Sequence, residues 1–499
     1  MPVTPTSAQV VHRLPVSSIL RFFRPVARRA ASPLALTLLL LLTLACNTGG
    51  TSAVSVPTPD FRTDALLDTV ETRTFNWFWE TTNPTNGLVP DRWPTKSFSS
   101  VAAIGFGLTA YPIGVERGYV SRGDASARVR TTLDFLWRAP QGATATGVTG
   151  YKGFYYHFLD MNTGLRFQQV ELSTIDTALL LGGVLVCREY FTGGDSVETA
   201  IRALADSIYT RVDWTWASPN APLVSMGWHP ESNFIPSDWR GFNEAMLLYV
   251  LALGSPTHAI DSAAWNQWAS TYQWATFYGQ PHVNFAPLFG HQYSQLFIDF
   301  RGIQDAYTHG RGIDYVENSR RATIAQRAYA IDNPSKFRDY GANIWGLTAS
   351  DGPLDTTMVV DGTTRQFHTY NARGAAANDI RDDGTIAPTA AGGSIAFAPE
   401  IVVPALKAMR TRYGDPLFGQ YGFVDAFNPT FHNASVRVQQ GRVVDGVGWF
   451  DTDYLGIDQG PIIAMIENYR TGLIWRLMRQ SPYIRRGLLR AGFAGGWLQ

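Results

Sequence analysis

Residues 241–258 read GFNEAMLLYVLALGSPTH, and this stretch indicates both the kind of fold and the place of its chemistry. Ala245–Leu253 is apolar on every face, as helices buried on all sides are. Glu244 precedes Leu247 and Leu251 by three and seven residues, a spacing that places all three on one helical face. Because an unpaired buried charge is costly, Glu244 must be paired, protonated or beside a solvated opening.

Two interpretations of Glu244 are open. Arg240 lies one helical turn earlier and could form a buried ion pair with it, in a helix whose N-cap is Ser237 or Asp238. Alternatively, Glu244 is a carboxylic acid in an aromatic-walled cleft, where loss of hydration raises its pKa and suits it to general acid catalysis.

The chain as a whole has the composition of a large folded protein. It has 499 residues, of which 45% are hydrophobic, and it contains 15 tryptophans. Apolar periodicity predicts helices over Asp64–Glu80, Ser126–Trp137, Ser173–Tyr190, Val197–Tyr209, Asn243–Leu253, Ala263–Tyr272, Tyr315–Ala330, Pro399–Tyr413 and Pro461–Met478. Strand-like alternation is clearest in Gly153–Asp160 and Ser435–Val444. Helices joined by long loops indicate an all-α toroid with a cleft at one end, and such loops usually carry function.

The N-terminal residues have the pattern of a secretory leader. Five arginines and no acidic residues precede an apolar run, Leu34–Ala45, that ends at Cys46. We expect a lipoprotein signal peptide over 1–45, lipidation of Cys46, a flexible tether over 46–59 and a single domain over 60–499. An ordinary secreted protein is the alternative. The expected location is the periplasm or the cell surface, with the lipid as the only membrane attachment.

Charge and motifs exclude several classes of function. Without the five leader arginines the chain has 36 basic and 41 acidic residues (36 − 41 = −5), which gives no electrostatic footprint for nucleic acid. Cys187 follows GGVLV in an apolar run and is expected to be a buried, inert thiol. Metalloprotease, CxxC, phosphate-loop and dinucleotide motifs are absent from the sequence. We therefore expect no metal, no cofactor and a monomer.

Further carboxylates lie in motif-like segments. Ser173 precedes Asp176 by three residues, as in a capping box, while Glu171 has no such explanation. Asp458 is expected in a loop just before a helix that begins at Pro461, either in an Asx-type turn or facing the cleft. One desolvated carboxyl group and one in a polar loop form the pair that glycoside hydrolysis requires.

Several long segments resemble the bacterial glucoamylase-like domain family, which includes the endo-β-1,2-glucanases. The resemblance is carried by APLFGHQYSQLFIDFRGIQD (286–305), DYVENSRRATIAQRAYAIDNP (314–334) and WGLTASDGP (345–353), and also by GFYYHFLDMNTG (153–164), ELSTIDTALLLGG (171–183) and YLGIDQGPIIAMIENYRTG (454–472). It implies an (α/α)6 barrel and inverting hydrolysis of β-1,2-glucan.

The resemblance also implies a set of site residues. Glu244 is expected as the general acid and Asp458 as the base, with Glu171 and Asp176 binding the sugar or tuning the other two. The expected substrate contacts are Trp228, His229, Trp239, Arg240, His291, Tyr293, Arg301, Trp345 and Tyr370. The sequence leaves open which carboxylate donates the proton. It also leaves open an exo-acting, sophorose-releasing enzyme, another β-glucanase or transglycosylase, and a non-catalytic glycan-binding lipoprotein.

Overall fold

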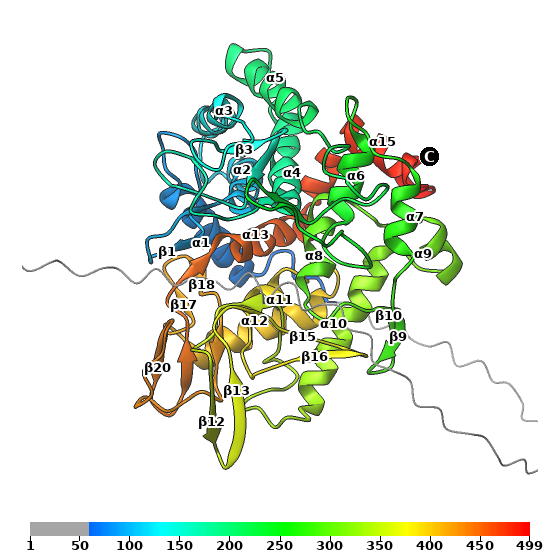
Figure 1. The fold of residues 1–499 in the computed structure, drawn as a ribbon. Helices are drawn as coiled ribbons and strands as arrows, with labels where there is room; N and C mark the ends of the chain where they lie inside the picture. The colour runs from blue at the N-terminus through cyan, green and yellow to red at the C-terminus, as the bar shows by residue number, and fades with distance from the viewer. Residues whose placement is uncertain (1–58) are drawn as a thin grey trace, which may run out of the picture. The chain divides into compact units, whose positions relative to one another are not determined.

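Helices dominate residues 59–499, the part of the chain that this computed structural model describes (Figure 1). In that part, six helices form a ring: α2 (Val101–Glu116), α4 (Thr174–Tyr190), α6 (Met246–Gly254), α8 (Phe289–Phe297), α11 (Pro388–Gly392) and α13 (Gly456–Arg470). Packing contacts join α2 to α4, α4 to α6, α6 to α8, α11 to α13, and α13 to α2. Between α8 and α11, Gln292 Nε2 donates hydrogen bonds to the Ala390 carbonyl oxygen (2.9 Å) and to Ser394 Oγ (2.8 Å).

A second helix packs against each helix of the ring. These outer helices are α1 (Ala65–Thr81) on α13, α3 (Arg122–Arg138) on α2, α5 (Ser196–Thr210) on α4, α10 (Tyr315–Asp332) on α8, α12 (Pro399–Tyr413) on α11 and α15 (Pro482–Arg490) on α6. Every residue of α6 is buried, whereas α5 buries one face and exposes the other. All-round apolar sequence therefore marks the inner layer and one-sided sequence the outer layer. The expected (α/α)6 helical toroid is confirmed.

The inner helices pack closely because glycines lie where they cross. A Cβ atom on Gly183 of α4 would stand 2.0 Å from the carbonyl oxygen of Gly105 on α2. A Cβ atom on Gly460 of α13 would stand 2.2 Å from the Phe106 ring. No larger side chain fits at either crossing, since protein interiors have no spare volume.

Short strands fill the loops between helices. A five-stranded antiparallel sheet has the order β3 (Gly150–Tyr151), β4 (Phe154–Tyr156), β6 (Leu172–Ser173), β7 (Gly227–His229), β8 (Asn233–Phe234). A three-stranded sheet joins β19 (Phe427–Asn428), β21 (Gly448–Phe450) and β20 (Arg442–Val444). The strand pairs are β1 (Arg92–Trp93) with β22 (Tyr454–Leu455), β2 (Ser99–Ser100) with β5 (Phe158–Leu159), β9 (Trp274–Phe277) with β10 (Gln280–Val283), β11 (Ala349–Ser350) with β14 (Asn371–Ala372), β12 (Thr356–Val360) with β13 (Thr363–Phe367), β15 (Gly374–Ala376) with β16 (Asp379–Arg381), and β17 (Phe418–Gly419) with β18 (Gly422–Phe423). The remaining helices are α7 (Ala263–Ala269), α9 (Ala306–Arg311), α14 (Leu473–Met478) and a 3-10 turn at Gly496–Leu498.

Some predicted element bounds are wrong. The helix expected from Pro461 begins at Gly456 and ends at Arg470, with α14 as a separate helix after it. Pro461 lies inside α13, where burial against α2 outweighs the hydrogen bond that proline forfeits. The helix expected from Asn243 begins at Met246, and its N-cap is Ala245 rather than Ser237 or Asp238.

One helix was missed and one strand was predicted too long, because the local composition did not indicate the observed structure. Helix α2 was not predicted, since Gly105, Gly107, Pro112 and Gly114 are all residues that disfavour helices in isolation. The strand expected over Ser435–Val444 is confined to β20. Among the described helices, none is both long and apolar enough to cross a bilayer. The expected signal peptide and Cys46 lie outside the described residues, as does the tether apart from Pro59.

Candidate active site

The carboxylates singled out in the sequence lie at the N-terminal ends of inner helices. Asp176 is in the first turn of α4, Glu244 stands two residues before α6, and Asp458 is in the first turn of α13. The sequence predicted Asp458 in the loop before this helix, and that prediction is wrong, because Asp458 is part of α13. Helix N-termini present free N–H groups and a partial positive charge, so this end of the toroid suits acidic side chains and polar ligands.

Glu244 is held by its main chain, and one oxygen of its carboxyl group has no partner in residues 59–499. Its carbonyl oxygen accepts a hydrogen bond from Ser294 Oγ on α8 (2.6 Å), which fixes the turn before α6. Its Oε2 atom is buried and has no hydrogen-bond donor within residues 59–499. Burial, reinforced by the charge of Asp176, raises the pKa of Glu244 to about 7. The alternative interpretation, an ion pair between Glu244 and Arg240, does not hold, because Arg240 Nη2 lies 3.9 Å from Asp238 Oδ2 instead.

Asp458 is the second carboxyl group with a strongly altered pKa. Its side chain is 2% exposed, and Thr389 Oγ1 on α11 donates to its carbonyl oxygen at 2.9 Å. Burial raises the pKa of Asp458 to about 7, against a hydrogen bond with Asp425 that lowers it. Near neutral pH both Glu244 and Asp458 can therefore gain or lose a proton, as acid and base catalysis require.

Tyr293, on α8, lies within the electrostatic influence of both carboxyl groups. Burial raises the pKa of its hydroxyl well above the usual value, and the charges of Asp458 and Glu244 both act on it in the same direction. The phenol therefore stays protonated and remains a hydrogen-bond donor at the site. Tyr370 is placed similarly, since burial and the charge of Asp458 raise the pKa of its hydroxyl. Glu244, Asp458, Tyr293 and Tyr370 thus share one site.

His157, which was not among the predicted site residues, lies between the carboxylates of Glu171 and Asp176. His157 Nδ1 lies 2.7 Å from Glu171 Oε1, and its Nε2 lies 3.6 Å from Asp176 Oδ2. Burial lowers the pKa of His157, but the two carboxylates outweigh it and raise that pKa to about 10. The expected N-cap is also present, because Ser173 Oγ accepts from the Asp176 N–H (3.1 Å). Asp176 therefore serves both the helix terminus and the site.

A set of acidic residues near Asp458 was also not predicted as part of the site. Arg92 donates to Asp91 Oδ2 (Nε, 3.1 Å) and to Asp351 Oδ2 (Nη1, 2.7 Å). Asp425 accepts a hydrogen bond from the main-chain N–H of Asp351 (2.7 Å) and interacts with Asp458. These residues come from four separate segments, so no spacing in the sequence brings them together. The nearest available signal was SDGP, inside the segment 345–353.

The predicted aromatic contacts divide into two groups. Trp228 pairs across the sheet with Leu172, next to Glu171, and its ring packs against Tyr151 and Trp216. His229 follows it, and Trp239 donates from Nε1 to Thr174 Oγ1 (3.0 Å) at the start of α4. These three lie near the Glu171 and Asp176 carboxylates. Trp345 is fully buried in the hydrophobic core.

Three other predicted contacts are placed differently. His291 is 1% exposed, and its Nε2 lies 3.2 Å from the Phe285 carbonyl oxygen. Arg240 is at the surface, with 42% of its side chain exposed. Arg301 pairs with Asp299 (2.7 Å) and stacks over Trp475, which follows the C-terminal end of α13. A helix of 15 residues is about 22 Å long, so Arg301 lies at the opposite end of the toroid from Asp458.

Comparisons with known proteins agree with the fold. The family model described as "Putative glucoamylase" matches residues 236–482. The solved structure of a putative glucoamylase from Bacteroides fragilis NCTC 9343 is 32% identical, with a TM-score of 0.73, over 90% of this chain and 100% of that one. The endo-β-1,2-glucanase from Chitinophaga pinensis, solved with sophorotriose and glucose, is 29% identical, with a TM-score of 0.73, over 87% and 99% of the two chains.

A curated relative extends the comparison to a longer protein. The exo β-1,2-glucooligosaccharide sophorohydrolase (non-reducing end) of Parabacteroides distasonis is 29% identical over 471 residues, which is 88% of this chain. The match spans 58% of the length of that relative. The identity and full coverage of the B. fragilis structure, together with the matching family model, establish that the chain belongs to the putative glucoamylase family.

Proposed function

We propose that this chain is an inverting glycoside hydrolase that cleaves β-1,2-glucan to sophoro-oligosaccharides. The observation that carries the proposal is the pair Glu244 and Asp458, two buried carboxyl groups with pKa values of about 7 that both act on Tyr293. Relatives named as an endo-β-1,2-glucanase and an exo-acting sophorohydrolase support the choice of substrate.

The chemistry divides between the two carboxyl groups. Glu244, protonated in its desolvated position, gives its proton to the leaving glycosidic oxygen, either directly or through a hydroxyl of the substrate. Asp458, ionised, takes a proton from the water that attacks the anomeric carbon from the opposite face. An inverting pair of this kind stands roughly 6.5–9.5 Å apart, which leaves room for that water.

The remaining site residues position the sugar. The Glu171, His157 and Asp176 group holds two carboxylates that can accept hydrogen bonds from glucose hydroxyls, with the charged imidazole fixing their orientation. Trp228 and Trp239, each 7% exposed, lie beside this group and support it from the hydrophobic core. The Tyr293 hydroxyl donates to the substrate or to the attacking water.

The decisive experiment is product analysis on linear β-1,2-glucan. A ladder of oligosaccharides from the start of the reaction identifies endo cleavage, which we propose. Sophorose as the sole early product identifies exo action by the same site. Binding of the glucan without shortening, by the wild-type protein, contradicts the proposal and identifies a glycan-binding protein.

We further propose that the protein is a monomeric lipoprotein attached to the bacterial membrane through Cys46. The support is the basic and apolar leader that ends at this cysteine. Metabolic labelling with a radioactive fatty acid tests this attachment. The wild-type chain should take up the label and Cys46→Ser should not; an unlabelled wild-type chain contradicts it.

A further inference from the structure

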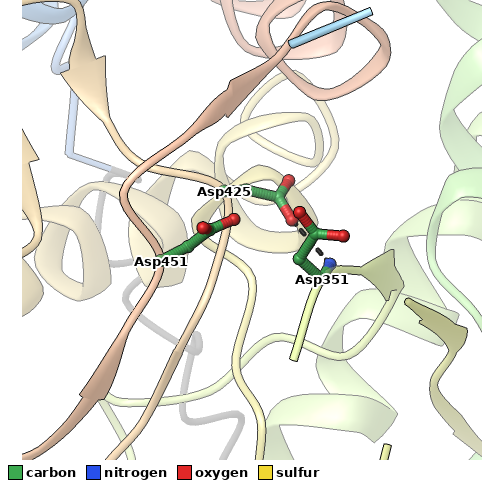
Figure 2. A group of neighbouring side chains, drawn as sticks. All are labelled: Asp351, Asp425 and Asp451. Carbon is green, nitrogen blue, oxygen red and sulfur yellow. Dashed lines mark hydrogen bonds between the residues drawn. The ribbon is translucent and has the colours of Figure 1, made fainter. Parts of the chain in front are cut away.

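Three aspartates from separate segments converge next to the candidate active site. Asp351, Asp425 and Asp451, here called the aspartate cluster, each contribute a carboxylate oxygen, and these oxygens all lie within 4.8 Å of one another. The three residues are 3%, 1% and 1% exposed. Figure 2 shows the carboxylates turned toward one another. The aspartate cluster therefore brings three carboxylate oxygens close together at a position buried from solvent.

The main chain holds the cluster rigidly. Strands β19 and β21 pair Phe427 with Phe450, and the pairing continues where the Asp451 N–H donates to the Ala426 carbonyl oxygen (2.9 Å). The Asp425 N–H donates to the Asp453 carbonyl oxygen (3.0 Å). Asp351 directly follows β11, and its N–H donates to Asp425 Oδ2 (2.7 Å). The three carboxylates are thus positioned by backbone hydrogen bonds, before any ligand binds.

These hydrogen bonds satisfy only part of the cluster. Asp451 Oδ1 accepts from the N–H groups of Thr452 (2.6 Å) and Asp453 (3.2 Å). Asp451 Oδ2 is buried and has no donor in the described part of the chain, whereas the Asp425 carboxyl group, besides the Asp351 N–H, has the neighbouring Asp458 carboxyl group as its partner. Buried carboxylate oxygens without a donor are costly unless a cation or a proton compensates them.

The positive charge next to the aspartate cluster is smaller than the negative charge that its three carboxylates carry when ionised. Three ionised carboxylates carry −3, and Arg92 is the cation that an ion pair joins to them in residues 59–499, through Asp351 at 2.7 Å. Arg92 is shared with Asp91, at 3.1 Å, so when all three carboxylates are ionised at least two negative charges have no ion-pair partner. One divalent cation would balance two negative charges.

We propose that the aspartate cluster binds one divalent cation of the calcium type. Ca²⁺ takes carboxylate oxygens at about 2.3–2.6 Å and tolerates irregular geometry, so its ligands can stand up to about 5.2 Å apart. Mg²⁺ requires about 2.0–2.1 Å and near-ideal octahedral geometry, which limits opposite ligands to about 4.2 Å. The bound ion ties β11, β19 and β21 together beside Asp458. The sequence could not indicate it, because the three ligands are 74 and 26 residues apart in the chain (425 − 351 = 74; 451 − 425 = 26).

Calcium binding by the whole protein tests the proposal without any glucan present. The protein is treated with EDTA and dialysed, and bound Ca²⁺ is measured at about 1 mM, a concentration that fills weak extracellular calcium sites. We expect one equivalent per chain, and a melting temperature that rises with Ca²⁺ and falls with EDTA. Asp451→Asn should lose both the equivalent and the shift. The asparagine has an amide oxygen in place of Asp451 Oδ1, and this oxygen can accept the same hydrogen bonds from the N–H groups of Thr452 and Asp453, so the fold is preserved.

Asp445→Asn is the matched control. Asp445 is exposed in the turn between β20 and β21, on the same hairpin, and its variant should bind calcium as the wild type does. If the wild-type chain binds less than a tenth of an equivalent of Ca²⁺, the proposal is overturned. Protons shared between the aspartates then neutralise the cluster. An equivalent that Asp451→Asn retains also overturns it, since the ion then lies elsewhere. Because the readout is metal content, failure here leaves the proposed hydrolase function untouched.

Discussion

His157 Nδ1 lies 2.7 Å from Glu171 Oε1, and this contact joins two elements that the sequence separates by a long loop. The histidine lies between β4 and β5, and the glutamate directly precedes β6. The same imidazole faces Asp176 at the start of α4 through its other nitrogen. A charged histidine therefore lies between two carboxyl groups at the rim of the helix ring, and its charge and hydrogen bond hold the pKa of Glu171 below the usual value despite burial.

Replacing this histidine should cost stability near neutral pH. We expect His157→Gln to lower the free energy of unfolding by about 2 kcal/mol. That is below the ~3–5 kcal/mol typical of fully buried pairs that lose one partner, because 22% of the His157 side chain is exposed. Urea unfolding at neutral pH measures the loss. An unchanged midpoint would mean that the pair contributes nothing to the folded state.

The cost of that substitution should disappear in alkaline solution. The pKa of His157 is about 10 in the folded chain, against about 6.5 in unfolded chains. Its stabilisation is therefore full below about pH 6.5 and is lost as the pH rises to about 10. Wild type and His157→Gln should unfold at increasingly similar urea concentrations over this interval. A gap that stays constant with pH contradicts the charged imidazole.

Glu244 should destabilise the folded chain near neutral pH, whereas His157 stabilises it, because burial raises the pKa of this carboxyl group and penalises its charged form. Its pKa is about 7 when folded, against a usual value of 4.5. The folded chain therefore loses stability from Glu244 as the pH rises between these values. Glu244→Gln removes that loss, so it should raise the melting temperature more at about pH 8 than at about pH 5. An equal shift at both pH values would argue against a desolvated carboxyl group.

Asp458→Asn should remove the base without disturbing the fold. General base catalysis contributes roughly 10²–10⁴-fold to a rate, and we expect a loss of that size in kcat on linear β-1,2-glucan. The asparagine keeps the shape of the side chain and relieves a buried charge, so the circular dichroism spectrum should be unchanged. Retention of more than about a tenth of the wild-type rate would assign the base to another residue.

Arg301 provides a prediction of no effect. It lies beyond the C-terminal end of α13 and contacts Asp299 and Trp475 rather than the site. Arg301→Ala should leave KM for the glucan within about twofold of the wild-type value, as is usual for a residue distant from the site. A large rise in KM would restore Arg301 to the substrate-binding residues that the sequence suggested.

The sequence predicted the helices that have apolar stripes and the carboxylates inside distinctive segments. Helix α12 has the predicted bounds, Pro399–Tyr413, because its proline and its tyrosine–glycine end mark both termini. Glu244 stood out because it is a charge next to an uninterrupted apolar run. Both features are local, so one stretch of sequence contains them completely.

The remainder depended on contacts between distant segments. Helix α2 contains three glycines and a proline that oppose helix formation locally, and only its burial against α4 and α13 makes it a helix. Asp351 and Asp425 lie in loops with ordinary composition, and their burial appears only when β11, β19 and β21 come together. Pairings such as His157 with Glu171 follow from sheet register, which the sequence does not specify here.

The central claim is that Glu244 donates the proton in hydrolysis of β-1,2-glucan with inversion. It is tested most directly by proton NMR of the first products released from linear β-1,2-glucan by the wild-type protein and by Glu244→Gln. The wild-type protein should release reducing ends that are initially α, because attack on a β-linkage from the opposite face inverts the anomeric carbon. Glu244→Gln should bind the glucan and release none. Products that are initially β, or undiminished cleavage by Glu244→Gln, would contradict the account.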